Sequence, residues 1–430
     1  MSRSGAAAES RPFASLLDRS GSGAAEAAWL AALRAEARAR FEVSGLPRTD
    51  DEDWRQTNVS PLGSIAFEPG DRSGATPEHP VLEALPPAIV LVNGRAAGAP
   101  RGASVEPLAE ALASRSSALE PHLGRVASDP RHPFVALNTA LFEDGALVTI
   151  DRGSAIDAPI HIVHVARPGA APVAAHPRTL VLAGAGSRGV VVETFVGPDG
   201  GTSLTNAVTE IVLDDGAQLD HVKIQIEGAE SWHVASVAAR LGRDARLASH
   251  NVSFGAKLAR NDIGARLDGP GAEALLHGLV LADGDQHVDN HTWLDHAAPH
   301  CPSWEMYKAV LAGRARSVFC GRIVVRDGAQ RTDAKQSNKN LILSDGAVVH
   351  TRPQLEIHAN DVKCTHGATI GRLDESALFY LRARGIGAAT ARDLLIHAFA
   401  AEVLGPIPVP ALREILLAGM DRRLDRELEG

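Results

Sequence analysis

The chain has 430 residues, which is long enough for two or three domains with a sizeable buried core. Apolar residues make up 45% and aromatic residues only 4%, with 40 glycines, a composition that suits closely stacked, sheet-rich layers better than an aromatic-cored helical bundle. The formal net charge of −9 gives no support for binding nucleic acid or a membrane, because both reward a basic surface.

The N-terminal third has helical and mixed character. Residues 1–23 are rich in Ser, Gly and Ala, so we expect a loose lead-in, and they lack the apolar run of a secretory signal. Strong helix formers then dominate 24–41, and a buried strand is expected at 88–93. Together these features predict an N-terminal domain over 24–141.

The middle of the chain, 142–371, has a different pattern. Short apolar runs alternate there with Gly, Asp and Asn turns, and helical patterning is nearly absent. A small-residue step recurs near Ala217, Ala245 and Ala272, at intervals close to 28 residues. Self-similarity of this kind indicates stacked coils, so the pattern favours a parallel β-helix, with a β-sandwich or double jelly roll as the alternative.

Helical patterning returns over 372–430. Asp374 is a plausible N-cap for a helix that Gly385 would end. Further helices are expected at 388–404 and 410–428. We expect this C-terminal domain to cover the open end of the solenoid or to receive a partner.

Familiar enzyme motifs are absent or misleading. Residues 184–189 match GxGxxG, but strand-forming residues follow, so we interpret the match as a tight turn between coils. There is no GxxxxGK[ST] loop, so any ATP used by a complex of this chain would have to bind another subunit.

A histidine-rich segment ends at a cysteine. Imidazole and thiolate both suit iron and zinc, so the segment is a weak metal-site candidate. The alternative is that the histidines lie on solvated edges or hydrogen-bond within coils. The residues are His287, His291, His296, His300 and Cys301.

Cys364 and His366 are better placed for metal chemistry. In an alternating strand pattern they would share one face, as a thiolate and an imidazole able to ligate iron or sulfur species. Two ligands are too few for a closed cluster site, so the others would come from elsewhere in the chain, another chain or the cargo. The alternative is that Cys364 is a small core residue, and Cys320 is expected to be one.

The block from Arg314 to Ile386, including KCTHGATIG at 363–371, resembles the SufB/SufD family of iron–sulfur cluster assembly proteins. Upstream, GLPRTDDEDWRQTNVSPL at 45–62 and HPFVALNTALFEDGA at 132–146 are similar to the family too. The resemblance covers nearly the whole chain from about residue 45, and Cys364 favours the SufD branch.

The resemblance implies a right-handed parallel β-helix flanked by N- and C-terminal helical domains. It also implies a non-catalytic scaffold that works with a SufB-like paralogue, a SufC-like ATPase and, indirectly, a cysteine desulfurase system. Cys364 and His366 match positions associated with a transient cluster or iron at a subunit interface. The resemblance does not place the His287–Cys301 segment.

The C-terminal helical region would dock the ATPase. The expected docking residues are Asp374, Leu378, Phe379, Tyr380, Arg384, Leu394, Leu395 and Phe399. A reduced flavin in the assembled complex is a further cofactor candidate, although the sequence shows no flavin-binding feature.

Three cysteines without a disulfide framework favour a cytoplasmic location. Two other functions compete with the scaffold: a β-helix carbohydrate-active enzyme, or a stand-alone metal-binding module built from the His-rich segment. The first usually needs export and charged catalytic clusters, and neither is evident in the sequence.

Overall fold

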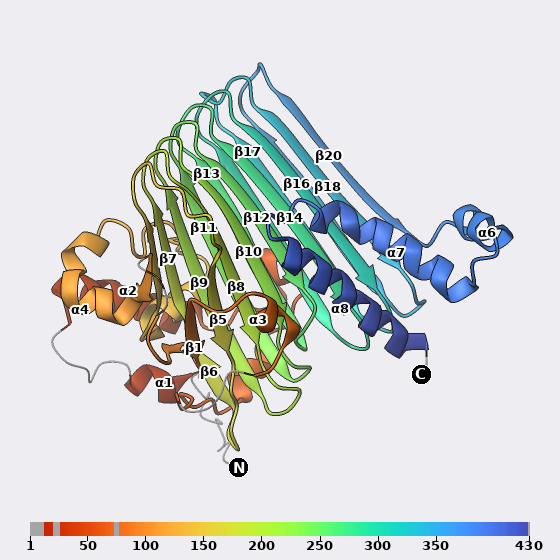
Figure 1. Cartoon of the computed structure of the whole chain (residues 1–430). Helices are drawn as coiled ribbons and strands as arrows, with labels where there is room; N and C mark the ends of the chain where they lie inside the picture. The colour runs from red at the N-terminus through yellow and green to blue at the C-terminus, as the bar shows by residue number, and fades with distance from the viewer. Residues whose placement is uncertain (1–12, 20–25, 73–76, 101, 103, 429–430) are drawn as a thin grey trace, which may run out of the picture.

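The structure is a computed structural model that describes residues 13–19, 26–72, 77–100, 102 and 104–428, with side chains described as far as residue 420. Its centre is a solenoid built from two long sheets (Figure 1). Sheet A contains β3 (Val105–Pro107), β4 (Gly145–Ile150), β6 (Val173–Ala175), β7 (Arg178–Ala183), β9 (Ser203–Leu213), β11 (Ser231–Leu241), β13 (Leu258–Leu267), β15 (His287–His296), β17 (Arg316–Val325) and β19 (Val348–Ile357).

Sheet B faces sheet A. It contains β1 (Ile89–Val92), β2 (Arg95–Ala96), β5 (Ile160–Val165), β8 (Arg188–Val196), β10 (Gln218–Ile226), β12 (Arg246–Ser253), β14 (Glu273–Ala282), β16 (Pro302–Leu311), β18 (Asp333–Ile342) and β20 (Lys363–Gly371).

The chain alternates between the sheets from β8 onward, and each strand pairs in parallel with the strand one coil earlier. Ser203 of β9, for example, pairs with Ser231 of β11, and their hydroxyls hydrogen-bond at 3.0 Å across a separation of 28 residues. Parallel pairing of this kind requires a crossover for every strand, whereas sandwiches and jelly rolls are antiparallel. The predicted parallel β-helix is therefore confirmed, and the sandwich alternative is wrong.

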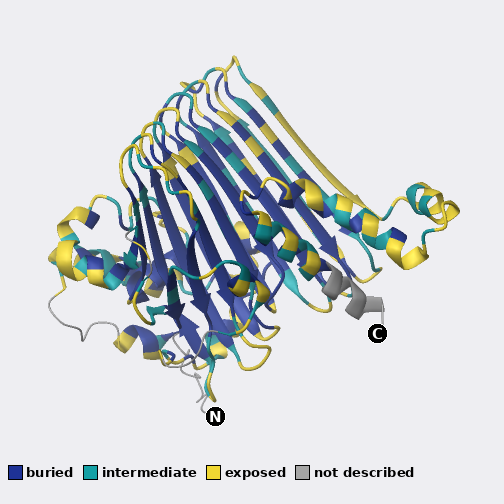
Figure 2. Cartoon of the chain, viewed as in Figure 1, coloured by how far each residue is buried: buried dark blue, intermediate teal, exposed yellow. Residues whose placement is uncertain are grey.

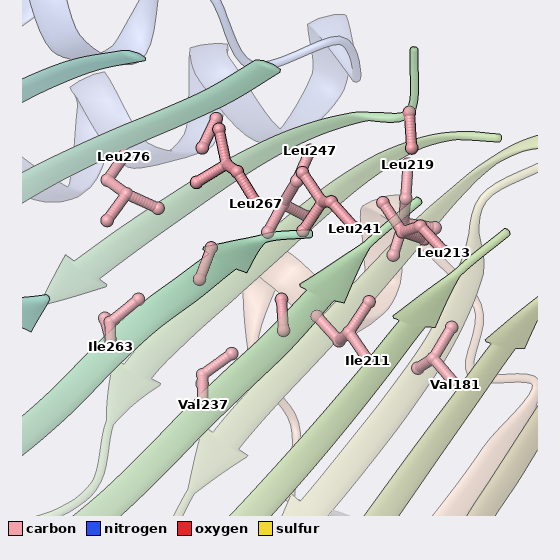
Figure 3. Close-up of a cluster of buried hydrophobic side chains, with 14 of the residues drawn as sticks. Val181, Ile211, Leu213, Leu219, Val237, Leu241, Leu247, Ile263, Leu267 and Leu276 are labelled. Atoms are coloured by element: carbon pink, nitrogen blue, oxygen red, sulfur yellow. The ribbon is translucent and has the colours of Figure 1, made fainter. Parts of the chain in front are cut away.

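Aliphatic side chains from both sheets fill part of the interior (Figure 3). Val181, Ile211, Ala239 and Ala265 come from successive strands of sheet A and stack in one file along the solenoid. Neighbouring strands lie ~4.8 Å apart, so each side chain covers the one in the coil before it. No single coil could bury this file alone, which is why the coils stabilise one another.

The recurrent small-residue steps lie at the turns between sheets. Ala217, Ala245 and Ala272 are each fully buried where the chain crosses from sheet A to sheet B. Gly216 adopts a φ of 71° immediately before the first of these alanines, a left-handed conformation that favours glycine. The GxGxxG match at 184–189 spans the turn between β7 and β8, as predicted, and no helix begins there.

The N-terminal region contains α1 (Ala14–Arg19), α2 (Ala28–Ser44), η1 (Glu52–Trp54), η2 (Ser60–Ser64), α3 (Pro80–Ala84), α4 (Leu108–Leu119) and α5 (Pro133–Leu141). Leu16 and Leu17 of α1 are buried with Phe41. The structure thus differs here from the loose lead-in expected for 1–23, of which 1–12 and 20–23 lie outside the described residues. Strands β1 and β3 continue sheets B and A, so this region is continuous with the solenoid.

Three helices follow the solenoid: α6 (Glu375–Ala383), α7 (Ala388–Leu404) and α8 (Pro410–Leu428). The buried side chains of α7 and α8 pack with apolar residues on the outer face of sheet B, among them Val222 and Leu279. Figures 1 and 2 show α7 and α8 lying along this flank, with the last strands left exposed. The expectation that these helices cover the open end of the solenoid is wrong, because their apolar side chains pack on the outer face of sheet B instead.

Candidate functional site at the open end of the solenoid

The last strand of sheet B, β20, forms an exposed edge. It pairs with β18 on one side and has no strand partner on the other among the residues the structure describes. Strand β19 ends sheet A in the same way. Both strands therefore present unpaired backbone groups at one end of the solenoid, which is a template for another strand. Val348, Ile357 and Ile370 add exposed aliphatic side chains to this end.

Cys364 and His366 both lie on β20, where their Cα partners are Ala334 and Gln336 of β18. Ala334 belongs to the interior cluster, and Cys364 packs against that cluster. The alternation of a strand then puts His366 on the same interior-facing side. Because no further coil covers β20, Cys364 is only half-buried and His366 is exposed.

The pair has the chemistry of an incomplete metal site. Burial raises the pKa of the Cys364 thiol, so the thiol is protonated at neutral pH and must lose its proton to bind a metal as thiolate. Across the part of the chain that the structure describes, no three His, Cys, Asp or Glu side chains gather into a metal-binding group. Cys364 and His366 can thus supply two ligands, and the remainder would have to come from outside this chain or from a cargo.

A row of buried polar side chains leads from the interior to His366. Glu305 of β16 pairs with Gln336 of β18, which pairs with His366 of β20, and Gln336 Nε2 donates a hydrogen bond to the Glu305 carboxyl. Burial raises the pKa of Glu305 to about 7. Sequence reasoning missed this row because its members lie about 30 residues apart. The available signal was Glu305, a carboxylate between the apolar residues Trp304 and Met306.

The titration of Glu305 predicts a pH-dependent stability. The pKa of Glu305 in the folded protein is raised above the ordinary 4.5. The stability that the protonated carboxyl contributes is therefore present at low pH and is lost as pH rises through about 7. Glu305→Gln removes the ionisation and keeps the shape. The difference in unfolding free energy, variant minus wild type, should therefore be about 2 kcal/mol larger at pH 7 than at pH 5, as measured by urea denaturation. An identical stability difference at both pH values would contradict this.

The His-rich segment does not converge on one point. His287 and His291 lie on the outer face of β15, where His287 Nε2 is 2.9 Å from the Thr57 hydroxyl and His291 Nε2 is 3.2 Å from Asp289 Oδ1. His296, buried, faces Ser303 Oγ at 3.0 Å, and burial lowers its pKa to about 4.

The last two candidates of the segment lie in a loop and in the buried interior. His300 follows β15 with a φ of 63°, and Cys301 is fully buried with its Sγ 3.4 Å from the Gly269 carbonyl oxygen. These residues thus take part in at least three separate local arrangements.

The contacts around His287 and His291 belong to a network that fastens the N-terminal segment to sheet A. Arg260 is fully buried, forms an ion pair with Asp289 at 2.7 Å and donates to the Asp53 carbonyl oxygen at 2.8 Å. Thr57 donates to Asp289 at 2.5 Å, and the Arg260 guanidinium lies 4.2 Å above the Trp54 ring. A buried, charge-assisted network of this kind positions the segment precisely.

Cys320 lies on the same outer face and is buried, as expected. Nitrogens Nε and Nη2 of Arg352 lie 3.4 and 3.3 Å from its Sγ, yet burial outweighs them and raises the thiol pKa. Arg352 in turn pairs with Glu52 at 2.9 Å. Cys320 is therefore a protonated packing residue beneath an arginine that contacts the N-terminal segment.

The predicted docking residues lie on α6, its caps and α7. Asp374 caps α6, because its Oδ1 accepts hydrogen bonds from the amides of Ser376 and Ala377. No residue of α6 is buried, and Figure 1 shows the helix projecting from the solenoid. Phe379 and Tyr380 are 75% and 56% exposed, and Arg384 lies 4.8 Å above the Tyr380 ring.

On α7, the docking candidates differ in access. Leu394 is 47% exposed, whereas Leu395 is half-buried like Leu378 of α6. Phe399 packs against the apolar cluster below α7, where Lys308 Nζ lies 4.4 Å from its ring. Among the docking candidates, the exposed apolar side chains therefore lie on α6 and the first half of α7, and Phe399 packs α7 against the solenoid.

Family models match most of the chain. The model described as the SufBD core domain of the SUF system for FeS cluster assembly matches residues 165–399, more than half of the chain. The chain belongs to the SufBD family. A second model, the SufBD N-terminal region, matches residues 90–162. No helix in the described ranges is long and apolar enough to cross a membrane.

Individual SufBD relatives align over nearly the full length. The iron–sulfur cluster assembly protein SufD of Escherichia coli is 30% identical, covering 89% of this chain and 90% of that protein. A SufBD family iron–sulfur cluster assembly protein of Synechocystis is 31% identical over 86% and 85%. Protein ABCI7, chloroplastic, of Arabidopsis thaliana is 30% identical over 86% and 80%. The predicted SufB/SufD family membership is confirmed, and the chain is a homologue of SufD.

Proposed function

We propose that this chain is a non-catalytic scaffold subunit that supports iron–sulfur cluster assembly at its interface with a SufB-like paralogue. The observation that carries the proposal is the uncovered last coil, which presents a thiol and an imidazole beside two unpaired strand edges. A partner that adds strands to β19 and β20 would bring its own side chains to Cys364 and His366. An incomplete site of this kind suits a scaffold, because it can hold a cluster and later release it.

In this account the iron and sulfur are cargo. Cys364 and His366 would hold iron or a nascent cluster transiently, and the partner and the cargo would complete the coordination. The Cys364 thiol must lose its proton on binding, because cysteine binds a metal as thiolate. Loading is therefore expected to release a proton at this end of the solenoid.

The exposed apolar side chains of α6 and α7 would receive a SufC-like ATPase. Phe379, Tyr380 and Leu394 have the character of interface anchors, since large aromatic side chains carry much of the binding energy of protein interfaces. Lys308 of β16 donates to the Phe399 carbonyl oxygen at 2.7 Å and forms an ion pair with Glu402 at 2.5 Å. These contacts connect α7 to sheet B and would transmit ATP-driven movement of the partner to the solenoid.

The proposal is tested by reconstituting the complex under anaerobic conditions from this chain, a SufB-like paralogue and a SufC-like ATPase. Cluster formation, followed by visible absorbance with iron, sulfide and ATP present, should require this chain. The isolated chain should hydrolyse neither ATP nor a panel of β-glucans and pectins. Equal cluster formation without the chain would contradict the scaffold role, and glycan turnover would favour the enzyme alternative.

A further inference from the structure

A row of two histidines and one methionine crosses three neighbouring strands on the outer face of sheet B. His250 of β12 pairs with His277 of β14, which pairs with Met306 of β16. Leu276, next to His277, faces the interior cluster, so the alternation of the strand turns His277 outward. Met306 belongs to the cluster formed with the C-terminal helices, and α7 packs on β14 and β16. The row is therefore separate from Cys364 and His366, which face the interior.

The two imidazole rings lie together and are buried. Their centroids are 5.2 Å apart with an angle of 54° between the ring planes, and His250 and His277 are only 2% and 6% exposed. Both nitrogens of His250 and Nδ1 of His277 are buried without a hydrogen-bond partner among the described residues. A buried polar atom left unpaired costs ~1–3 kcal/mol. Three such atoms at one place indicate a bound water or ion.

The donor set distinguishes between kinds of ion. Two neutral imidazoles and a thioether carry no charge, and a thioether selects soft ions such as Cu(I) over Mg(II) or Ca(II). An uncharged donor set in a buried site leaves the charge of the ion uncompensated, which costs a divalent ion more than a monovalent one. Met306 has three rotatable side-chain bonds, so its sulfur can adapt to an ion held by the rings.

We propose that His250, His277 and Met306 form a binding site for a soft monovalent metal ion of the Cu(I) class. The rings supply the nitrogen ligands that now lack partners, and Met306 supplies a soft third ligand from the neighbouring strand. Because the site lies between strands beside α7, a bound ion would also stabilise the attachment of the C-terminal helices to sheet B. This site is independent of the cluster-assembly role proposed above.

The methionine content of the chain allows a direct test. The sequence has three methionines, Met1, Met306 and Met420, so a protein labelled with [methyl-13C]methionine gives at most three methyl signals. Ag(I) serves as a redox-inert probe of the Cu(I) class. The titration uses a Cys364→Ala background, because the half-exposed thiol of Cys364 would compete for a soft ion. One equivalent of Ag(I) should shift the Met306 methyl signal and leave the Met420 signal unchanged.

Two histidine variants decide whether the site is built as proposed. His250→Gln and His277→Gln should each require at least ~10-fold more Ag(I) for the same Met306 shift, since loss of one ligand costs about 1.4 kcal/mol or more. Met420 is fully buried in the same apolar cluster, so its unchanged signal shows that each variant is folded. If a histidine variant fails to fold, Met306→Leu, which conserves volume, takes its place. This variant should weaken Ag(I) binding in calorimetry.

Three results would overturn the proposal. The first is a Met306 signal that does not move at several equivalents of Ag(I). The second is an identical titration in the wild type and both histidine variants, which would mean that the thioether binds the ion alone. The third is uptake of Zn(II) at this row without uptake of Ag(I), which would contradict the assigned class of ion.

Discussion

Replacing Cys364 by Ala is expected to lower the rate of cluster formation on the assembled complex by roughly 100-fold. Loss of a ligand's outer-shell partner alone typically costs 10- to 100-fold in metal affinity, and the loss of a ligand costs at least as much. His366→Ala should have a similar effect, because an incomplete site has no spare ligand. The measurement is the anaerobic appearance of cluster absorbance in complexes containing wild-type or variant chain.

Matched variants separate a ligand role from general damage. Cys320→Ala removes a buried thiol that packs beneath Arg352, and His358→Ala removes an exposed imidazole that follows β19 at the same end of the solenoid. Both should assemble clusters at the wild-type rate. Wild-type assembly by Cys364→Ala and His366→Ala, with the complex intact, would remove these two residues from the site and leave the scaffold role standing.

The double variant Phe379→Ala/Leu394→Ala is expected to weaken association with the ATPase by roughly 1,000-fold. Each side chain is a large, exposed apolar group, and an interface hot spot is worth ≥ 2 kcal/mol. Neither is buried in the isolated chain, so the substitutions should change its unfolding free energy by less than ~0.5 kcal/mol each. The dissociation constant is measured by calorimetry or biolayer interferometry with the purified ATPase.

Val43→Ala is the control for this prediction. Val43 is 90% exposed on α2 in the N-terminal region, and its loss tests whether removing any exposed apolar group weakens the complex. Unchanged affinity in this variant, together with the large loss in the α6–α7 double variant, places the ATPase on the C-terminal helices. Wild-type affinity in the double variant would contradict the proposed docking surface.

Local patterns predicted much of the architecture. Helices α6 and α7 begin and end within a residue or two of the sequence prediction, because Asp374 caps one and Gly385 and Gly405 mark their ends. The steps at Ala217, Ala245 and Ala272 predicted stacked coils because a small residue is needed where the chain passes between tightly packed sheets. Strand alternation likewise put Cys364 and His366 on one face without knowledge of neighbouring coils.

Long-range packing was harder to predict. The attachment of α7 and α8 to the outer face of sheet B depends on Val222 and Leu279, whose apolar character reads only as part of two buried strands. To predict the Glu305–Gln336–His366 row and the His250–His277–Met306 row, the register between coils must be known. The number of residues per coil varies from one coil to the next, so the sequence does not give that register. Sequence spacing alone therefore could not show whether the histidines of the His-rich segment converge, and it missed both rows.

We expect the uncovered end of the solenoid to join this chain to a sister subunit. Hydrogen–deuterium exchange of the chain, alone and with the SufB-like paralogue, probes this end of the molecule. Amides of β19 and β20 should exchange at least tenfold more slowly in the complex, because their unpaired backbone groups gain strand partners. Unchanged exchange in β19 and β20, with protection appearing elsewhere on the chain, would contradict it.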